Sequence, residues 1–161
     1  MTDPYSLLFR TKQFGDRNLH ALATENIDQL DAFEGSIVLR VLDHIHAVDR
    51  IFQHHLLGTP HEFQAARSET LPELAQLVEA GRELGDWYVD YVEGLSPADL
   101  DQPLDFTFTS GKPTRMTRGE ILLHVCTHGT YHRGNVGILF QKKGIAPGAD
   151  GVTGYLETAN A

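Results

Sequence analysis

The chain has 161 residues, 41% of them hydrophobic and 22% charged, which is the composition of an ordinary globular protein. Its formal net charge of -9 argues against a nucleic-acid-binding surface, which needs a basic face, but leaves room for a small anionic ligand. The single cysteine, Cys126, excludes an intrachain disulfide, and neither a signal-peptide pattern nor a membrane-spanning apolar run is seen. We therefore expect one domain over residues 1–161 in a soluble, cytoplasmic protein that binds no membrane.

Capping and turn residues predict where the first three helices begin and end. Asp3-Pro4, a capping residue before a proline, begins a helix that extends into the mid-twenties. Gly58-Thr59-Pro60 ends a second helix over residues 34–57 and leads into a loop. Thr70 and Glu73 form a capping-box pattern that opens a third helix, and Gly94 closes it.

The second helix carries a histidine in its predicted core-facing seam. The seam repeats at intervals of four and three, through Ile37, Val41, His44, Val48 and Ile51. His46 and His54 are predicted to face solvent, whereas His55 lies in the last turn beside free main-chain carbonyls. Outside the last long helix, His44 is thus the one histidine that the pattern buries in mid-helix.

The period changes after the third helix, from helical spacing to alternation. Ser96-Pro97 starts a short capped turn, and the segment 104–116 alternates apolar and polar residues around a turn at Ser110-Gly111. This segment predicts a two-stranded ribbon that must lie across the helices, because a lone hairpin is only marginally stable. Thr117 and Glu120 form another capping box, which opens a helix that continues to Lys143.

Three histidines recur every four residues in this last long helix: His124, His128 and His132. Residues four apart lie above one another, and His128 and His132 fall about 40° apart on the helical wheel, within the apolar stripe. The pair is therefore predicted to point at the core, with His124 at the edge of the stripe. A buried imidazole needs partners for its nitrogens, so hydrogen-bonded core histidines are one interpretation and half of a metal site is the other.

His44 from the facing helix favours the metal interpretation. Four long helices with one ribbon predict an all-α four-helix bundle, and bundles commonly hold metals between inward side chains of facing helices. His44, His128 and His132 would supply three neutral imidazoles with an open position, which describes a reactive site rather than a structural one. Imidazole ligands without thiolates favour a divalent ion such as zinc or nickel.

Two sequence segments carry a family resemblance. Leu42-Asp43-His44 and its continuation to Ile51, together with His124 to Gly134 containing His-x-x-x-His-Arg-Gly, resemble the DinB family. The resemblance implies a DinB-type four-helix bundle, a divalent metal bound by His44, His128 and His132, and a homodimer. His124 is common in such motifs without being one of the three ligands. Asn135 departs from the pattern, because a glutamine often follows His-Arg-Gly.

The function implied by the resemblance is a metal-dependent transferase that uses a low-molecular-weight thiol such as bacillithiol, mycothiol or glutathione. Arg133 or Tyr131 is a candidate contact for an anionic cosubstrate, although the wheel turns Arg133 towards a flank or a dimer surface. Cys126 is predicted to be a packed thiol on another face. One alternative is a metal-dependent hydrolase. Such an enzyme normally needs a carboxylate base near the metal, and Glu120 and Asp43 lie off the ligand stripe. Another is a stress-response protein that binds a metal or ligand without turnover.

Overall fold

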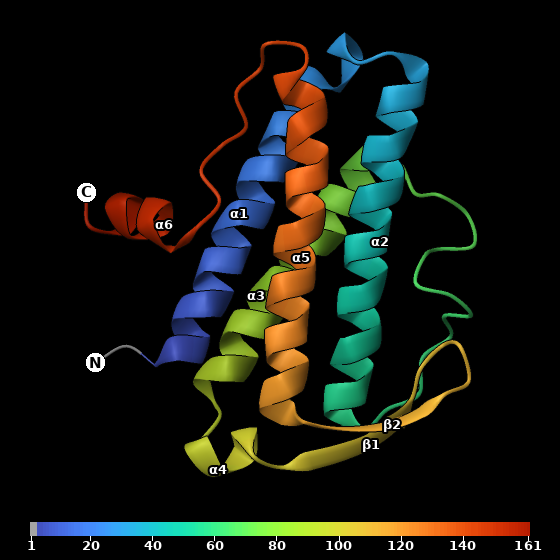
Figure 1. The fold of residues 1–161 in the computed structure, drawn as a ribbon, viewed down its shortest axis with the longest axis vertical. Helices are drawn as coiled ribbons and strands as arrows, with labels where there is room; N and C mark the ends of the chain where they lie inside the picture. The colour runs from blue at the N-terminus through green and yellow to red at the C-terminus, as the bar shows by residue number, and fades with distance from the viewer. Residues whose placement is uncertain (1–2) are drawn as a thin grey trace.

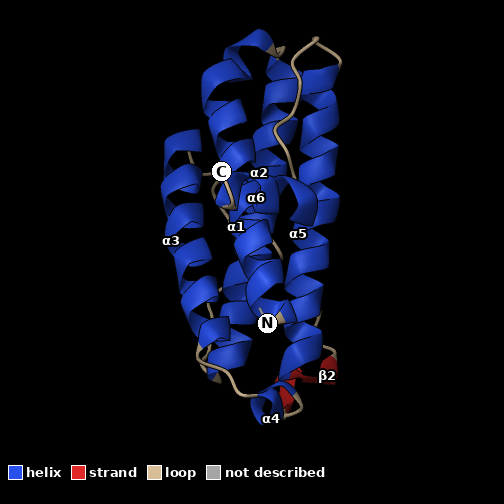
Figure 2. Ribbon diagram, turned by 90° about the vertical axis from the view of Figure 1, so that its left-hand side faces the viewer, coloured by secondary structure: helices blue, strands red, loops and turns tan. Residues whose placement is uncertain are grey.

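The protein is predominantly helical, with one small two-stranded antiparallel sheet (Figure 1; Figure 2). The structure is a computed structural model and describes residues 3–161. The elements follow in the order α1 (Pro4–Asn26), a short 3-10 helix (Ile27–Gln29), α2 (Ala32–Leu57), α3 (Leu74–Glu93), α4 (Pro97–Leu100), β1 (Pro103–Thr107), β2 (Pro113–Thr117), α5 (Arg118–Gln141) and α6 (Val152–Ala159). None of the helices in this part of the chain is long and apolar enough to cross a membrane.

The four long helices lie side by side along the long axis of the molecule (Figure 1). Helices α1 and α2 each pack between α3 and α5, so α5 faces α1 on one side and α2 on the other. The C-terminal α6 lies outside this group and contacts α1. The position of α5 between two neighbours gives it a buried arc wider than a single stripe.

Most predicted helix ends are confirmed. The Asp3 side chain accepts a hydrogen bond from the Ser6 amide before Pro4, and Gly58 ends α2 in the left-handed conformation with φ 66°. The capping box predicted for Thr70 and Glu73 is wrong. Helix α3 begins at Leu74, and Glu73 is itself the cap, in a reciprocal pair with Gln76. The same spacing of a polar residue and Glu or Gln occurs twice here, and the chain uses the second.

The predicted ribbon is confirmed and lies across one end of α2 and α5 (Figure 1). Its strands pair antiparallel, with Leu104 opposite Met116 and Phe106 opposite Thr114. The half-buried side chains Leu104, Phe106 and Phe108 pack against the core beneath it. The ribbon leads through the confirmed capping box of Thr117 and Glu120 into α5.

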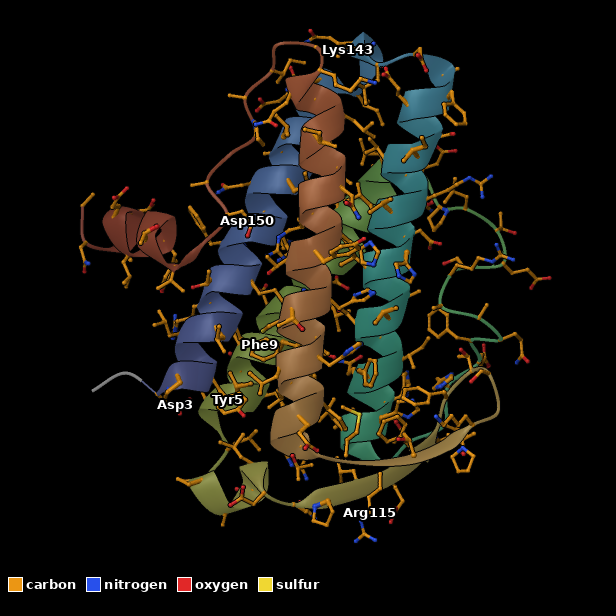
Figure 3. All side chains as sticks on the ribbon, viewed as in Figure 1. Asp3, Tyr5, Phe9, Arg115, Lys143 and Asp150 are labelled. Carbon is orange, nitrogen blue, oxygen red and sulfur yellow. The ribbon has the colours of Figure 1, made fainter. Side chains whose placement is uncertain are left out.

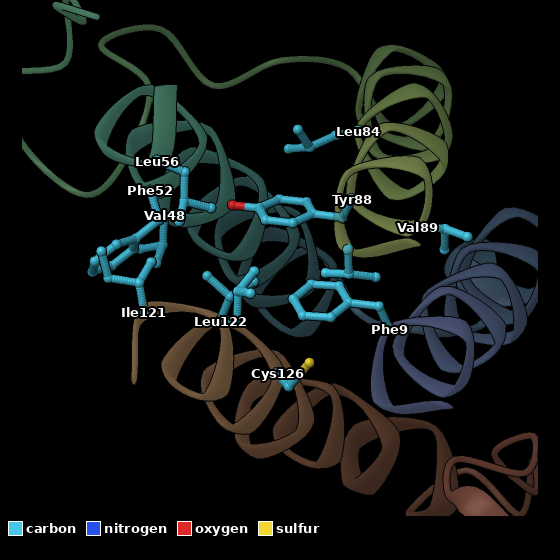
Figure 4. Close-up of a cluster of buried hydrophobic side chains, with 12 residues drawn as sticks. Phe9, Val48, Phe52, Leu56, Leu84, Tyr88, Val89, Ile121, Leu122 and Cys126 are labelled. Carbon is cyan, nitrogen blue, oxygen red and sulfur yellow. The ribbon is translucent and has the colours of Figure 1, made fainter. Parts of the chain in front are cut away.

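The core is divided into two apolar clusters along the long axis. The cluster nearer the ribbon includes Phe9, Phe52, Tyr88 and Leu122, and the Phe9 and Tyr88 rings stack with centroids 5.1 Å apart (Figure 4). The other cluster consists of Leu19, Leu22, Ala23, Leu30, Val38, Leu42, Leu77, Val136 and Phe140. Between the two clusters, helices α1, α2 and α5 carry several ionisable side chains, which we call the polar middle layer: Lys12 and Asp16 on α1, Asp43, His44 and Asp49 on α2, and His128, His132 and Arg133 on α5.

Candidate metal centre

His44 of α2 and His128 and His132 of α5 meet where these two helices pack together. Their ring centroids are 4.8 Å apart for His44 and His128, 4.7 Å for His44 and His132, and 4.5 Å for His128 and His132. One nitrogen from each ring lies within 4.8 Å of the other two. Among residues 3–161, these three side chains form the group of three or more histidine, cysteine or carboxylate residues spaced to hold a metal ion.

All three rings are half-buried rather than enclosed in the core. The fully buried arc of α5 contains Val125, Gly129, Val136 and Arg133, and the histidines line the edge that faces α2. The expectation that they point into the core is therefore only partly right. Their position at a helix seam gives the nitrogens access to a small ligand, which a closed core position would not.

A main-chain carbonyl orients His44. Its Nδ1 lies 2.7 Å from the Ala66 carbonyl oxygen, which can only accept, so Nδ1 carries the proton and donates. The Nε2 lone pair of His44 is therefore free and faces Nε2 of His128 at 3.0 Å. Fixing one ring nitrogen through a carbonyl is the usual way in which proteins orient a metal-binding histidine. Sequence analysis missed Ala66, because nothing in a loop sequence shows which carbonyl will face a distant helix.

The Ala66 loop is in turn tied to α2. The buried Asp43 carboxylate, next to His44, accepts a hydrogen bond of 3.0 Å from the Ser68 amide. One oxygen of Asp43 therefore positions the loop, and Asp43 is not among the side chains that could hold a metal at the three histidines. This arrangement agrees with the prediction that Asp43 lies off the ligand stripe.

The surroundings of His128 and His132 keep these two imidazoles neutral. Burial, with repulsion from His132 and His44, lowers the pKa of His128 to about 3. Burial and the proximity of His44 also lower the pKa of His132. Both rings therefore offer lone pairs at neutral pH, which is the form that binds metal.

One ring nitrogen of the three histidines is left unpaired. Nδ1 of His128 is buried and has no hydrogen-bond partner among the described residues. The atom of His128 that faces His44 is Nε2, so the unpaired Nδ1 does not distinguish a metal site from core histidines. The donor set of three imidazoles, with Nε2 of His44 facing His128, fits a metal ion.

The remaining histidines lie elsewhere. His124 is exposed, with its ring 5.6 Å from His128 and 4.9 Å from Phe52, so it borders the site. The prediction of a solvent-facing His46 is wrong, because α3 covers that side of α2. Burial and the nearby Arg50 charge lower the pKa of His46 to about 4. His54 is half-buried and not fully solvated, since its Nδ1 lies 2.9 Å from the Thr59 hydroxyl.

The position predicted for Arg133 is also wrong. Its side chain is buried, bonding Asp16 of α1 at 2.9 Å and Asp150 in a bidentate pair at 2.6 and 2.8 Å. Because α5 packs against α1 as well as α2, its buried arc includes the edge on which Arg133 projects. Tyr131 is 69% exposed, and Cys126 is buried as predicted.

Arg133 belongs to a buried ionic network that the sequence did not predict. Lys12 of α1 donates to Asp16 at 2.8 Å and to Asp49 of α2 at 2.6 Å, and Asp16 also receives Arg133. The signal in the sequence was Lys12 and Asp16, one turn apart on the buried side of the first helix. The network joins α1, α2 and α5 in the polar middle layer that also contains the three histidines.

These features define a helical protein with a three-histidine centre between two antiparallel helices. Comparison with known proteins gives the family: the model of the DinB family matches residues 5–161. Protein DinB of Bacillus subtilis (strain 168) is 30% identical over 74 residues, which cover 46% of this chain and 42% of that protein. The chain belongs to the DinB family.

Proposed function

We propose that this protein is a metal-dependent transferase of DinB type, in which His44, His128 and His132 bind a divalent zinc or nickel ion at the middle of a four-helix bundle. The observation that carries the proposal is the convergence of three imidazoles within 4.8 Å, with the oriented Nε2 of His44 facing Nε2 of His128. Half-burial of all three rings leaves one side for a substrate, as expected for a reactive site with three protein ligands.

The proposed cosubstrate is a low-molecular-weight thiol, and the second substrate is a carbon electrophile with a leaving group. A divalent cation held by the three histidines would lower the pKa of a thiol that reached it and so would favour the nucleophilic thiolate near neutral pH. In the transfer, the thiol proton passes to solvent, a sulfur–carbon bond forms, and the leaving group departs with the electron pair of the broken bond. His44, His128 and His132 would hold the ion beside the reacting sulfur.

Metal-assisted hydrolysis receives less support from the surrounding residues. Asp43 is occupied by the Ser68 amide, and Glu120 accepts from the Thr117 amide at 2.7 Å in the capping box of α5. Each therefore has one oxygen committed elsewhere, and neither belongs to the group of side chains gathered at the three histidines.

The first experiment is metal analysis by mass spectrometry of protein purified without an affinity tag. Wild-type protein should contain close to one metal ion per chain, whereas His44→Ala and His128→Ala should contain almost none. His54→Ala is the matched control, because it removes a half-buried histidine of α2 that lies outside the site. Wild-type protein that takes up neither zinc nor nickel on reconstitution would overturn the proposal.

Activity is tested next, by adding a panel of thiols and electrophiles to the metal-loaded protein and following thioether formation. Turnover that is lost in His128→Ala supports the transferase. Stoichiometric metal without turnover of any pair would leave a metal-binding protein and refute the transferase. The proposed homodimer and single-domain organisation are tested by light scattering and by a single cooperative unfolding transition.

A further inference from the structure

A second polar groove lies between α2 and α3, outside the three-histidine site. Its volume is about 460 Å³, within the range typical of small-molecule sites. Helix α2 contributes His46, Arg50 and Gln53, and α3 contributes Ala80, Glu83, Leu84 and Trp87. Along α2, His46 and Arg50 project about 200° and 240° round the helix from His44, so the groove opens on another side from the metal centre.

The groove is lined by one cationic and one anionic side chain that are not paired with each other. Arg50 bonds the neutral Gln53 side chain at 2.7 Å and makes no ion pair within the described residues. Glu83 likewise makes none, because the neighbouring Arg82 bonds Glu79 and Asp86 instead. The other arginines of this region, Arg17 and Arg82, have carboxylate partners.

The rest of the lining is apolar or neutral. Trp87 presents a half-buried indole, fixed by stacking on Tyr91 with centroids 4.7 Å apart, and Leu84 is buried beneath it. His46 contributes an imidazole whose Nδ1 is buried without a hydrogen-bond partner among the described residues.

We propose that this groove binds a small zwitterion of the amino-acid class, with its carboxylate on Arg50, its ammonium on Glu83 and its side chain against Trp87. A ligand with only a negative charge is attracted by Arg50 but repelled by Glu83. A ligand with only a positive charge is attracted by Glu83 but repelled by Arg50. A ligand with both charges compensates both groups, and an apolar body completes the contact with Trp87 and Leu84. Gln53 and His46 can then add hydrogen bonds.

The chain provides its own reporter, because Trp87 is the single tryptophan. Titration of wild-type protein with L-leucine or L-phenylalanine, excited at the tryptophan band, should give a saturable change in fluorescence. N-acetyl and C-terminal amide derivatives of the same amino acids, each lacking one charge, should bind at least about tenfold more weakly. Equal responses to the derivatives, or no saturable response to a set of polar, apolar and aromatic amino acids, would overturn the proposal.

Matched variants assign the contacts. Arg50→Gln and Glu83→Gln should each weaken binding about tenfold or more, whereas Glu79→Gln, one turn away and outside the groove, should leave it unchanged. Trp87→Phe has no tryptophan, so its binding is measured by calorimetry and should be weaker than that of the wild type but still detectable. Such a result would show that the fluorescence change of the wild type reports occupancy of the groove. If Glu79→Gln affects binding as much as Glu83→Gln, the response is nonspecific and the site is refuted.

The inference is independent of the proposed transferase. His128→Ala protein should bind the zwitterion with wild-type affinity, because none of the groove residues belongs to the three-histidine site. Loss of metal and retention of amino-acid binding in that variant therefore separates failure of one proposal from failure of the other. Loss of both, in a protein with wild-type circular dichroism, would contradict a separate site.

Discussion

The Ala66 carbonyl makes the orientation of His44 depend on a loop, and the loop depends on one carboxylate. Asp43 accepts the Ser68 amide hydrogen bond two residues beyond Ala66. If the Asp43 hydrogen bond is lost, the loop is free to move and the Ala66 carbonyl no longer fixes the orientation of His44. Loss of Asp43 should therefore weaken metal binding more than it weakens the fold.

Asp43→Ala should therefore lower metal affinity by about tenfold, in the range observed when residues that support metal ligands are lost. Affinity is measured by competition with a chromophoric chelator at pH 7.5. Asp43→Asn is the control, since its amide oxygen still accepts from Ser68 and affinity should stay within about twofold. An unchanged affinity in Asp43→Ala would show that the loop does not support the site.

Two carboxylates share the Lys12 ammonium, and they titrate differently. Burial opposes ionisation of Asp16, but Lys12 and Arg133 more than compensate and lower its pKa. Burial raises the pKa of Asp49 to about 6, above the ordinary value of about 3.9, because Lys12 only partly offsets burial and the charge of Asp16 adds repulsion.

A raised folded-state pKa means that the folded protein binds the Asp49 proton more tightly than the unfolded chain. Ionising Asp49 thus costs stability progressively as pH rises from about 4 to about 6, by about 2–3 kcal/mol in total. Relative to Asp49→Asn, the wild-type free energy of unfolding should fall by that amount between pH 4 and pH 7. Urea titrations at both pH values measure it, and parallel behaviour of the two proteins would contradict the raised pKa.

At the scale of elements, the sequence of α5 predicts the histidines of the candidate metal centre but not the burial of Arg133. The spacing of His128 and His132 with His44 was enough to select the residues that come together. The burial of Arg133 was not predictable from a wheel with one apolar stripe, since α5 packs against both α1 and α2. The acidic partners of Arg133 lie 117 and 17 residues away, a distance over which local patterns carry no information.

Helix ends were more predictable because capping is local. Asp3, Gly58, Gly94 and Thr117 each cap the helix that the sequence assigned to them. The start of α3 was misplaced by a competing pattern three residues earlier. The burial of His46 depends on how α3 packs onto α2, and the contact of Ala66 with His44 depends on how the loop does. No short sequence pattern specifies either.

Gly15 of α1 explains how a buried arginine fits between two helices. A Cβ at this position would lie 2.8 Å from Asp150 Oδ1 and 2.9 Å from Arg133 Nε. Gly15→Ala should therefore destabilise the protein by about 1–3 kcal/mol, despite the better helix propensity of alanine, because the ion pair must shift. The free energy of unfolding in urea checks this.

Gly134 of α5 is the matched control for Gly15. It also lies within a long helix, but a Cβ there would meet nothing within 4 Å. Gly134→Ala should stabilise the protein by up to about 1 kcal/mol through helix propensity alone. If both substitutions stabilise equally, the close approach at Gly15 has no energetic consequence.

At the scale of the molecule, the ionic network separates two apolar clusters and joins three of the long helices. Because removing one partner of a buried ion pair leaves an uncompensated charge, each contact of this layer matters more than an exposed pair. The same layer reaches the C-terminal segment, since Asp150 lies against the middle of α1, where it pairs with Arg133 (Figure 3).

The Arg133–Asp150 pair should thus hold the C-terminal segment in place. Among the long helices, α6 packs mainly on α1. One such contact is the pair Phe14 and Tyr155, whose ring centroids are 6.0 Å apart. Asp150→Asn weakens the bidentate pair, so residues 145–159 should exchange amide hydrogens at least about tenfold faster while α2 and α3 stay protected. Asp90→Asn, an exposed change on α3, is the control. Faster exchange throughout α5 as well would show instead that Asp150 supports the whole helix, whereas unchanged exchange would show that the apolar contacts of α6 suffice.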